Sequence, residues 1–208
     1  MPQIPIPDAN LSLEPDWLAP AEADALLAAV METVSWETHR IRMFGRAVDS
    51  PRLSCWIGDP GASYVYSRTR FAPRPWPAAL QALRSRIDAA AGVAMNSVLA
   101  NLYRDGRDAM GWHSDDEPEL GPRPVIASLS LGGTRRFLLR HRRDPGQRLA
   151  LELPHGSLLL MSADTQAHWR HALPRTARPV AARINLTFRR ILPCQPRPGD
   201  CLRPGSSR

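Results

Sequence analysis

The sequence predicts a mainly β domain with flanking helices, of the α+β class. The chain has 208 residues, 43% of them hydrophobic, which is enough to build one buried core. Six short apolar segments follow one another between residues 96 and 190, separated by turn residues, as in a β domain. The two segments with helical periodicity both precede them. This order predicts a barrel or double-sheet domain with two helices packed outside it.

The first helix is predicted over "PAEADALLAAVMETV" (20–34), with Pro20 near its first turn, after an extended proline-rich lead. Residues 1–35 thus form an N-terminal lead and helix. Strands are predicted next, between loop and turn sequences, in "WETHRIRMFG" (36–45), "RLSCWIG" (52–58) and "SYVYS" (63–67). A second helix is predicted over 76–92, opened by Pro77 and closed by Gly92.

The main β region follows this helix. Its predicted strands are "NSVLANLY" (96–103), "PVIASLSLG" (124–132), "RRFLLRH" (135–141), "RLALEL" (148–153), "GSLLLMS" (156–162) and "ARINLTFRR" (182–190). The segment 192–208 is rich in Pro, Gly, Ser and Arg and is predicted to be a disordered basic tail.

Composition points to a basic chain in a reducing compartment. All 27 basic residues are arginine and the formal net charge is +7, so a polyanionic partner is plausible, although a general bias toward arginine would give the same charge. No long apolar run and no leader sequence is found, so we expect a soluble, intracellular protein, cytoplasmic or nucleoid-associated, without a membrane partner. The three cysteines, Cys55, Cys194 and Cys201, form no C-x-x-C pair.

One short stretch, "GWHSDDE" (111–117), has the residue types of a metal site. His113 and Asp115 stand two apart and project to the same side of an extended segment, so they can share one ion. With a distant histidine they would make the two-His-one-carboxylate triad that leaves coordination sites open on Fe(II). The alternative is a solvated acidic loop with a hydrogen-bonded histidine. His141 and His155 lie in turns and are expected at the surface, whereas spacing does not choose between His168 and His171.

The last predicted strand carries a polar face. In "RINLTFR" the side chains of Arg183, Asn185, Thr187 and Arg189 alternate with apolar ones, so they share one face. A polar face inside a β domain predicts a polar ligand, and two arginines suit a short dicarboxylate. Asn101 and Tyr103 likewise share one face of "NSVLANLY".

The segments "NLYRDG", "WHSDDE", "ASLSLGG", "HGSLLLM", "HWRHALP" and "RINLTFR" occur in this order between residues 101 and 189. Through these segments the chain resembles the AlkB family of Fe(II)/2-oxoglutarate dioxygenases, in particular the branch that repairs alkylated DNA. The resemblance extends over about residues 36–191 and implies that 36–191 form the dioxygenase domain. The resemblance implies a double-stranded β-helix, or jelly roll, with an N-terminal nucleotide-recognition lid at about 36–75. It also implies Fe(II) as cofactor, with 2-oxoglutarate and O₂ as co-substrates.

Position by position, the resemblance implies His113, Asp115 and His171 as metal ligands, because His171 is the histidine before "ALP". Arg183 would pair with the distal carboxylate of 2-oxoglutarate, helped by Tyr103 and Asn185. Arg189 would lie near the other carboxylate and Asp115, with Asn101 close by.

The resemblance also assigns residues to the base. Phe44 would be the wedge that fills the gap left by an extruded base. Tyr64 and Tyr66 would form the walls of the base pocket, and Glu117 would contact the edge of the base. Trp112 is also expected to bind the substrate. The alternatives are packed strand aromatics and a solvent-facing carboxylate. The stretch "RHRRDPGQR" (140–148) fits a basic hairpin that grips a duplex.

The implied function is oxidative demethylation of N-alkylated bases such as 1-methyladenine and 3-methylcytosine in DNA, with release of formaldehyde while 2-oxoglutarate becomes succinate and CO₂. The expected partner is alkylated DNA, double- and single-stranded, with RNA as a further candidate, and the chain is expected to be a monomer. The same chemistry on RNA or protein is the main alternative. A basic, non-enzymatic nucleic-acid-binding module is the other, but it would not need a facial triad and an arginine strand.

Overall fold

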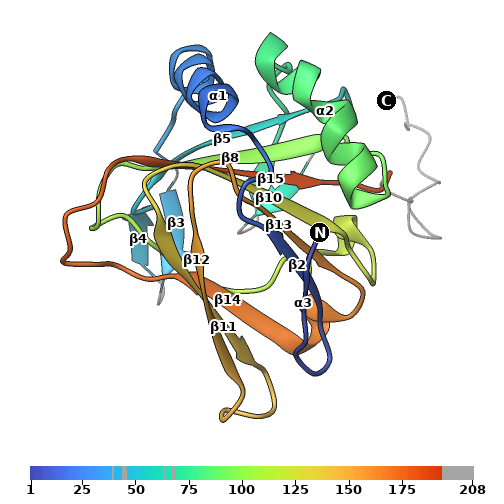
Figure 1. Cartoon of the computed structure of the whole chain (residues 1–208). Helices are drawn as coiled ribbons and strands as arrows, with labels where there is room; N and C mark the ends of the chain where they lie inside the picture. Colours follow the sequence, from blue (N-terminus) through green and yellow to red (C-terminus); the bar gives the residue numbers. More distant parts are fainter. Residues whose placement is uncertain (39, 44–45, 63, 67–68, 194–208) are drawn as a thin grey trace, which may run out of the picture.

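Two facing antiparallel sheets form the body of the molecule, with two helices on the outside (Figure 1). This computed structural model describes residues 1–38, 40–43, 46–62, 64–66 and 69–193, and within 40–48 and 64–71 it describes the backbone only. The predicted class, mainly β with flanking helices, is confirmed. Among the described helices, none is long and apolar enough to cross a bilayer.

The larger sheet has seven strands. Their order is β1 (Gln3–Ile4), β2 (Asn10–Glu14), β13 (Leu158–Ser162), β10 (Ile126–Gly132), β15 (Arg183–Arg189), β8 (Ser97–Tyr103) and β5 (Leu53–Gly58). At the end of β10 the chain needs glycine, because Gly132 has a φ of +82° and a Cβ there would lie 2.3 Å from the carbonyl oxygen of Ala182. This close approach brings β10 against the start of β15, which carries Arg183.

The smaller sheet has four strands, in the order β12 (Arg148–Leu153), β11 (Arg135–His141), β14 (Trp169–Leu173) and β9 (Met110–His113). Its inner face packs on the larger sheet through apolar residues such as Phe137, Leu139 and Leu173. Two further two-stranded sheets, β3 (Arg40–Met43) with β4 (Arg46–Asp49) and β6 (Tyr64–Tyr66) with β7 (Thr69–Phe71), lie in the segment predicted to be the lid.

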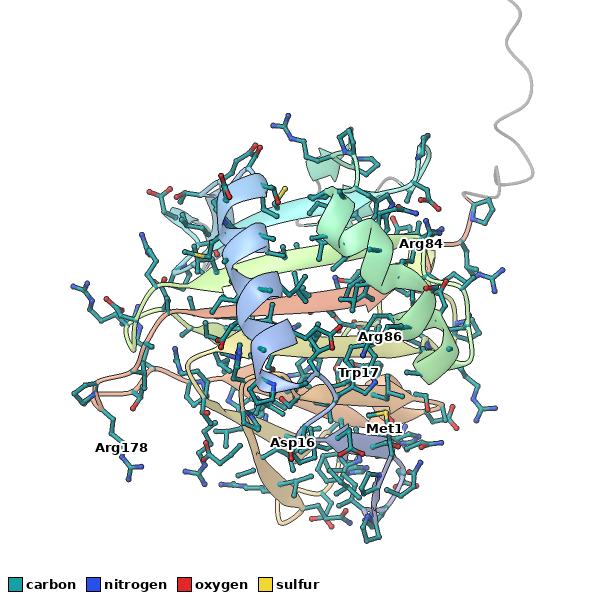
Figure 2. All side chains as sticks on the ribbon, turned by 45° about the horizontal axis from the view of Figure 1, so that its top comes forward. Met1, Asp16, Trp17, Arg84, Arg86 and Arg178 are labelled. Carbon is teal, nitrogen blue, oxygen red and sulfur yellow. The ribbon has the colours of Figure 1, made fainter. Side chains whose placement is uncertain are left out.

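The two predicted helices, α1 (Pro20–Thr33) and α2 (Ala78–Ala91), lie side by side across the outer face of the larger sheet (Figure 2). Leu26 and Val30 of α1 and Leu80 and Ile87 of α2 are buried in the core that these helices share with the sheet. α2 ends at Gly92, whose φ of 68° is in the left-handed region, as the sequence predicted. The helices thereby shield one face of the sheet and leave the other to face the smaller sheet.

The structure adds elements that the pattern did not predict. The proline-rich lead was expected to be merely extended, but β2 pairs with β13 and completes the larger sheet. β4, β7, β9 and β14 were not predicted as separate strands, nor were the short helices α3 (Thr165–His168) and η1 (Pro118–Leu120). β9 and β14 matter most, because they carry the candidate metal ligands.

Candidate metal and co-substrate site

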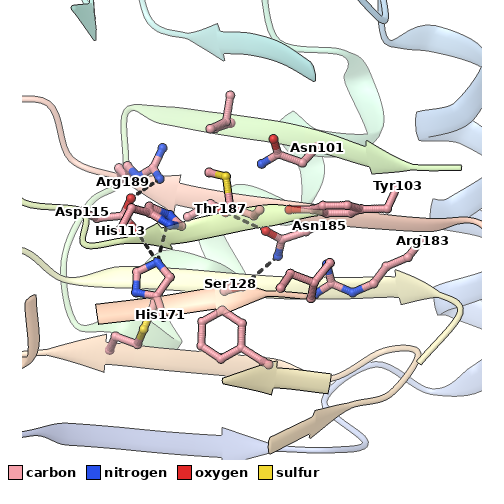
Figure 3. Close-up of a pocket in the computed structure, with 15 residues that line it drawn as sticks. Asn101, Tyr103, His113, Asp115, Ser128, His171, Arg183, Asn185, Thr187 and Arg189 are labelled. Carbon is pink, nitrogen blue, oxygen red and sulfur yellow. Dashed lines mark hydrogen bonds and ion pairs between the residues drawn. The ribbon is translucent and has the colours of Figure 1, made fainter. Parts of the chain in front are cut away.

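A pocket opens between the two sheets (Figure 3). Strands β8, β10 and β15 of the larger sheet form one wall, and β9, β11 and β14 of the smaller sheet contribute the other. The eight residues predicted to hold metal and co-substrate all line it: Asn101, Tyr103, His113, Asp115, His171, Arg183, Asn185 and Arg189. Alternation along β15 therefore placed its polar face correctly.

His113, Asp115 and His171 meet at one end of this pocket (Figure 3). His113 ends β9 and His171 lies directly opposite it on β14, so their side chains project from the same face of the smaller sheet. The two Nε2 atoms are 3.1 Å apart, and His171 Nε2 is 3.9 Å from Asp115 Oδ2. The register of one strand pair thus brings together ligands that are far apart in the sequence.

The histidines are held in the form that binds metals. His113 Nδ1 lies 2.8 Å from the carbonyl oxygen of Gly111, which can only accept, so Nδ1 carries the hydrogen and the neutral ring has its lone pair on Nε2. Burial lowers the pKa of His113, and burial together with the charge of His113 lowers the pKa of His171 to about 3. The ring of Phe137 stacks on His171 at 5.2 Å. Both imidazoles are therefore neutral at pH 7.

Asp115 is buried and fixed on two sides. Burial raises its pKa, but the charge of Arg189 and the neighbouring histidines outweigh this, and the pKa of Asp115 lies below its usual value. Arg189 Nη2 donates to Asp115 Oδ1 at 2.5 Å, and the backbone N–H of Asp115 donates to Oε1 of Gln166 at 3.0 Å. The carboxylate is thus ionised and oriented before any ligand arrives.

The donor set fits a divalent metal ion with open coordination sites. Two nitrogen ligands at right angles, each about 2.1 Å from an ion, lie about 3 Å apart, and the two Nε2 atoms are 3.1 Å apart. Two neutral imidazoles and one carboxylate on one face match the arrangement of non-haem Fe(II) oxygenases. His113, Asp115 and His171 would hold the ion.

A second group of similar composition does not fit a metal. Ligand atoms of Asp8, His141 and His168 also lie within 4.8 Å of one another. However, His141 Nδ1 accepts the backbone N–H groups of Arg143 and Asp144, so in the neutral ring Nε2 carries the hydrogen and faces Asp8 Oδ2 at 3.4 Å. This histidine was expected at the surface, and that expectation was wrong: it is 8% exposed, because it stabilises the loop from inside.

The other end of the pocket carries a buried cation. Arg183 is 2% exposed, and its Nη2 donates to Ser130 Oγ at 2.9 Å. Within the described residues, no carboxylate pairs with Arg183 and no partner meets its Nε. Burial lowers the pKa of this guanidinium to about 10, so it stays charged at pH 7. Since an unpaired buried charge is costly, this end fits an anionic ligand.

Polar side chains continue the pocket wall between Arg183 and the triad (Figure 3). Asn185 Nδ2 donates to Ser128 Oγ at 2.7 Å, and Thr187 Oγ1 donates to Asn185 Oδ1 at 2.9 Å. The Tyr103 ring lies 5.5 Å from the guanidinium carbon of Arg183. An elongated ligand with a carboxylate at each end, such as 2-oxoglutarate, matches this sequence of groups.

Two of the residues predicted to contact a base, Trp112 and Glu117, lie outside this pocket. Trp112 is 39% exposed on β9, with the Arg140 guanidinium 4.2 Å from its ring centroid, and Glu117 is half-buried just before η1. Among the described residues, neither belongs to the pocket lining. Phe44 lies outside the described residues, as do the side chains of Tyr64 and Tyr66. Their base-binding roles stay predictions.

Sequence reasoning missed residues that support the site without lying in a recognisable motif. Gln166 in α3 holds the backbone of Asp115, and Arg52, buried before β5, donates from Nε to Asn101 Oδ1 at 2.7 Å. Met110, Phe137 and Met161 add apolar lining. A single polar residue such as Gln166 gives no signal in the sequence, and its role is recognised only when the fold places it beside a candidate metal ligand.

Two sheets that enclose a His-Asp-His group and a buried arginine, with no carboxylate partner among the described residues, define a jelly-roll, metal-dependent oxygenase. Residues 10–189 match the family model described as the 2OG-Fe(II) oxygenase superfamily. The "DNA oxidative demethylase ALKBH2" of Mus musculus is 40% identical over 183 residues, covering 83% of this chain and 77% of that protein. The chain therefore belongs to the AlkB family within the 2OG-Fe(II) oxygenase superfamily, and its cofactor and co-substrate are Fe(II) and 2-oxoglutarate.

Other relatives agree. The "Alpha-ketoglutarate-dependent dioxygenase alkB homolog 3" of Homo sapiens is 38% identical over 194 residues, covering 89% of this chain and 67% of that protein. The solved structure of OsALKBH1 superposes with a TM-score of 0.62 at 17% identity, covering 90% of this chain and 99% of that one. This structural likeness confirms the jelly-roll fold. It does not test the predicted lid.

Proposed function

We propose that this enzyme removes methyl groups from ring nitrogens of DNA bases, of the 1-methyladenine and 3-methylcytosine type, by oxidative demethylation. The observation that carries the proposal is the pocket with a His-Asp-His face at one end and, at the other, the buried Arg183, which has no carboxylate partner among the described residues. The choice of DNA is supported by the printed function of the ALKBH2 relatives. The net charge of +7 also favours a polyanionic substrate.

Each end of the pocket has a task in this proposal. Arg183 binds the distal carboxylate of 2-oxoglutarate through its fork, while Tyr103 and Asn185 orient the chain of the co-substrate. His113, Asp115 and His171 hold Fe(II), and Arg189 keeps Asp115 ionised and correctly turned. When bound, Fe(II) with 2-oxoglutarate supplies the activation of O₂ that hydroxylates the methyl group.

The protein's remaining task is to present the methyl group. Hydroxylation gives a hemiaminal that breaks down to formaldehyde and the restored base, while 2-oxoglutarate leaves as succinate and CO₂. A methyl group on N1 of adenine or N3 of cytosine sits on the pairing edge, so the base must leave the duplex to reach the pocket. We assign this task to the segment 36–75, in which Phe44 acts as the wedge and Tyr64 and Tyr66 form walls of the base pocket. Glu117, outside this segment, contacts the edge of the base.

The test uses oligonucleotides that carry 1-methyladenine or 3-methylcytosine, in matched single-stranded DNA, duplex DNA and RNA. We expect formaldehyde and succinate from the DNA substrates, and none from the His171→Ala variant. His168→Ala is the matched control, because His168 lies outside the pocket in α3, and it should retain most of the activity. An inactive His168→Ala beside an active His171→Ala would overturn the ligand assignment, and turnover on RNA alone would overturn the choice of DNA.

A further inference from the structure

The segment that carries Asp115 is held on both sides by one arginine outside the pocket. Arg142 directly follows β11, in the loop that leads to β12. Its Nη2 donates to Ser114 Oγ at 2.7 Å and also contacts Oδ2 of Asp116. A single nitrogen therefore binds both chain neighbours of the candidate carboxylate ligand.

Backbone contacts make this a junction of three segments. Ser114 is buried and its hydroxyl donates to the carbonyl oxygen of Trp169 at 2.9 Å, while the backbone N–H of Arg142 donates to the carbonyl oxygen of His168 at 2.7 Å. Trp169 begins β14, the strand of His171. Arg142 thus connects the end of β11 with the segment that follows β9 and with His168, which directly precedes β14.

Its position differs from that of the groups that touch the carboxylate itself. Arg189 holds an oxygen of Asp115, and Gln166 holds its backbone N–H. Gln166 thus fixes the peptide group that precedes Asp115, whereas Arg142 holds the side chains of both chain neighbours, Ser114 and Asp116. A metal site needs its ligands within about 0.5 Å of the right position, so a change in the backbone of residues 114–116 would move the carboxylate away from the imidazoles.

We propose that Arg142 is a positioning residue, which holds Asp115 in the geometry that binds the metal. The inference rests on the proposed metal centre and adds a residue that contacts neither metal nor substrate. One of the two interactions of Arg142 is an ion pair with Asp116. The Asp116 side chain is 52% exposed, so salt screens this pair. The other interaction is the hydrogen bond to the hydroxyl of the buried Ser114, which salt weakens much less.

The experiment measures the affinity of the full chain for Mn(II), as a probe of the metal site, in the presence of saturating 2-oxoglutarate and without O₂. Because outer partners of metal ligands typically change metal affinity by about 10–100-fold, we expect Arg142→Met to weaken Mn(II) binding about 10-fold. Arg142→Lys, which keeps the charge, should recover part of this loss. Arg143→Met removes the same charge from the next, exposed residue and should leave Mn(II) affinity unchanged.

Two further measurements separate positioning from a purely structural role. The difference in Mn(II) affinity between wild type and Arg142→Met should become smaller at high salt, because salt then screens the ion pair with Asp116 in the wild type. Ser114→Ala, a milder change for the case that Arg142→Met does not fold, should also weaken Mn(II) binding. Equal Mn(II) affinities of wild type and both variants would overturn the inference, whatever happens to thermal stability. A wild type that binds no Mn(II) would instead overturn the proposed metal centre itself.

Discussion

The most unusual single residue in the described structure is Arg183, a guanidinium that is 2% exposed and has no carboxylate partner among the residues described. Taking a charge out of water costs several kcal/mol unless another group compensates. Part of the compensation comes from Ser130 and from the ring of Tyr103. The remaining desolvation cost of the guanidinium is not compensated by the protein. An anion that binds Arg183 offsets this cost, which strengthens its binding.

Arg183→Lys should therefore weaken 2-oxoglutarate binding even though the charge is kept. The lysine ammonium cannot form the two parallel hydrogen bonds of the guanidinium fork, and a hydrogen bond to a charged group contributes about 1.5–3 kcal/mol. This corresponds to about a 10–100-fold rise in the dissociation constant, which calorimetry can measure. The control is Arg136→Lys, on the exposed face of β11. Unchanged binding in Arg183→Lys would mean that the distal carboxylate is held elsewhere.

Sequence alternation was sufficient for some site residues and not for others. The polar face of β15 was correctly predicted because every second residue of a strand shares a face. Spacing left His168 and His171 open, and only the family resemblance favoured His171; in the structure His171 lies opposite His113, whereas His168 ends α3. Pairing between distant strands leaves no local trace, so spacing alone did not reveal it.

At the scale of elements, the strands most relevant to function were the hardest to predict. β9 has only four residues and β14 only five, and in both of them polar or small residues interrupt the apolar ones. Each becomes a strand because a neighbour in the sheet accepts its hydrogen bonds. In contrast, the long apolar strands and both helices carry their periodicity in their own sequence, and they were predicted nearly to the residue.

The strand pair β3 and β4 belongs to the segment assigned to the lid, and Phe44 follows β3 in the chain, outside the described residues. If Phe44 is the wedge, Phe44→Ala should lower kcat/KM on methylated duplex DNA by a larger factor than on the matched single strand. Unstacking costs a few kcal/mol only where a stack exists. The measurement compares the two kcat/KM ratios at one salt concentration, since affinity for DNA depends on salt. Equal losses would identify an ordinary packing residue.

For the whole molecule, the buried histidines make the stability of the metal-free protein depend on pH. His171 has a folded pKa of about 3, and the pKa of His113 is also lowered, whereas both ionise near 6.5 when unfolded. Their stability contribution is complete above pH 6.5. Below it the unfolded chain takes up protons that the folded chain does not, so the contribution of His171 is lost progressively down to about pH 3, and that of His113 is lost in the same direction.

The expected slope is up to about 1.4 kcal/mol per pH unit for each histidine. Denaturant unfolding with a chelator present, between pH 7 and pH 5, measures the free energy of unfolding. His171→Gln should flatten this slope, because one proton fewer is taken up on unfolding, while His168→Gln should leave it nearly as steep. A slope that does not change in His171→Gln would contradict a neutral, buried His171.

The pairing of β9 with β14 also links the lifetime of the enzyme to the supply of iron. His113 and His171 are 58 positions apart, so an unfolded chain offers a metal only the local pair of His113 and Asp115, and the full set of ligands exists after the two strands have closed that loop. An ion that binds the folded state alone stabilises it by about 2.7 kcal/mol when present at 100 times its dissociation constant. Unfolded chains are the ones that proteases degrade. Iron shortage would therefore reduce the amount of enzyme as well as its activity.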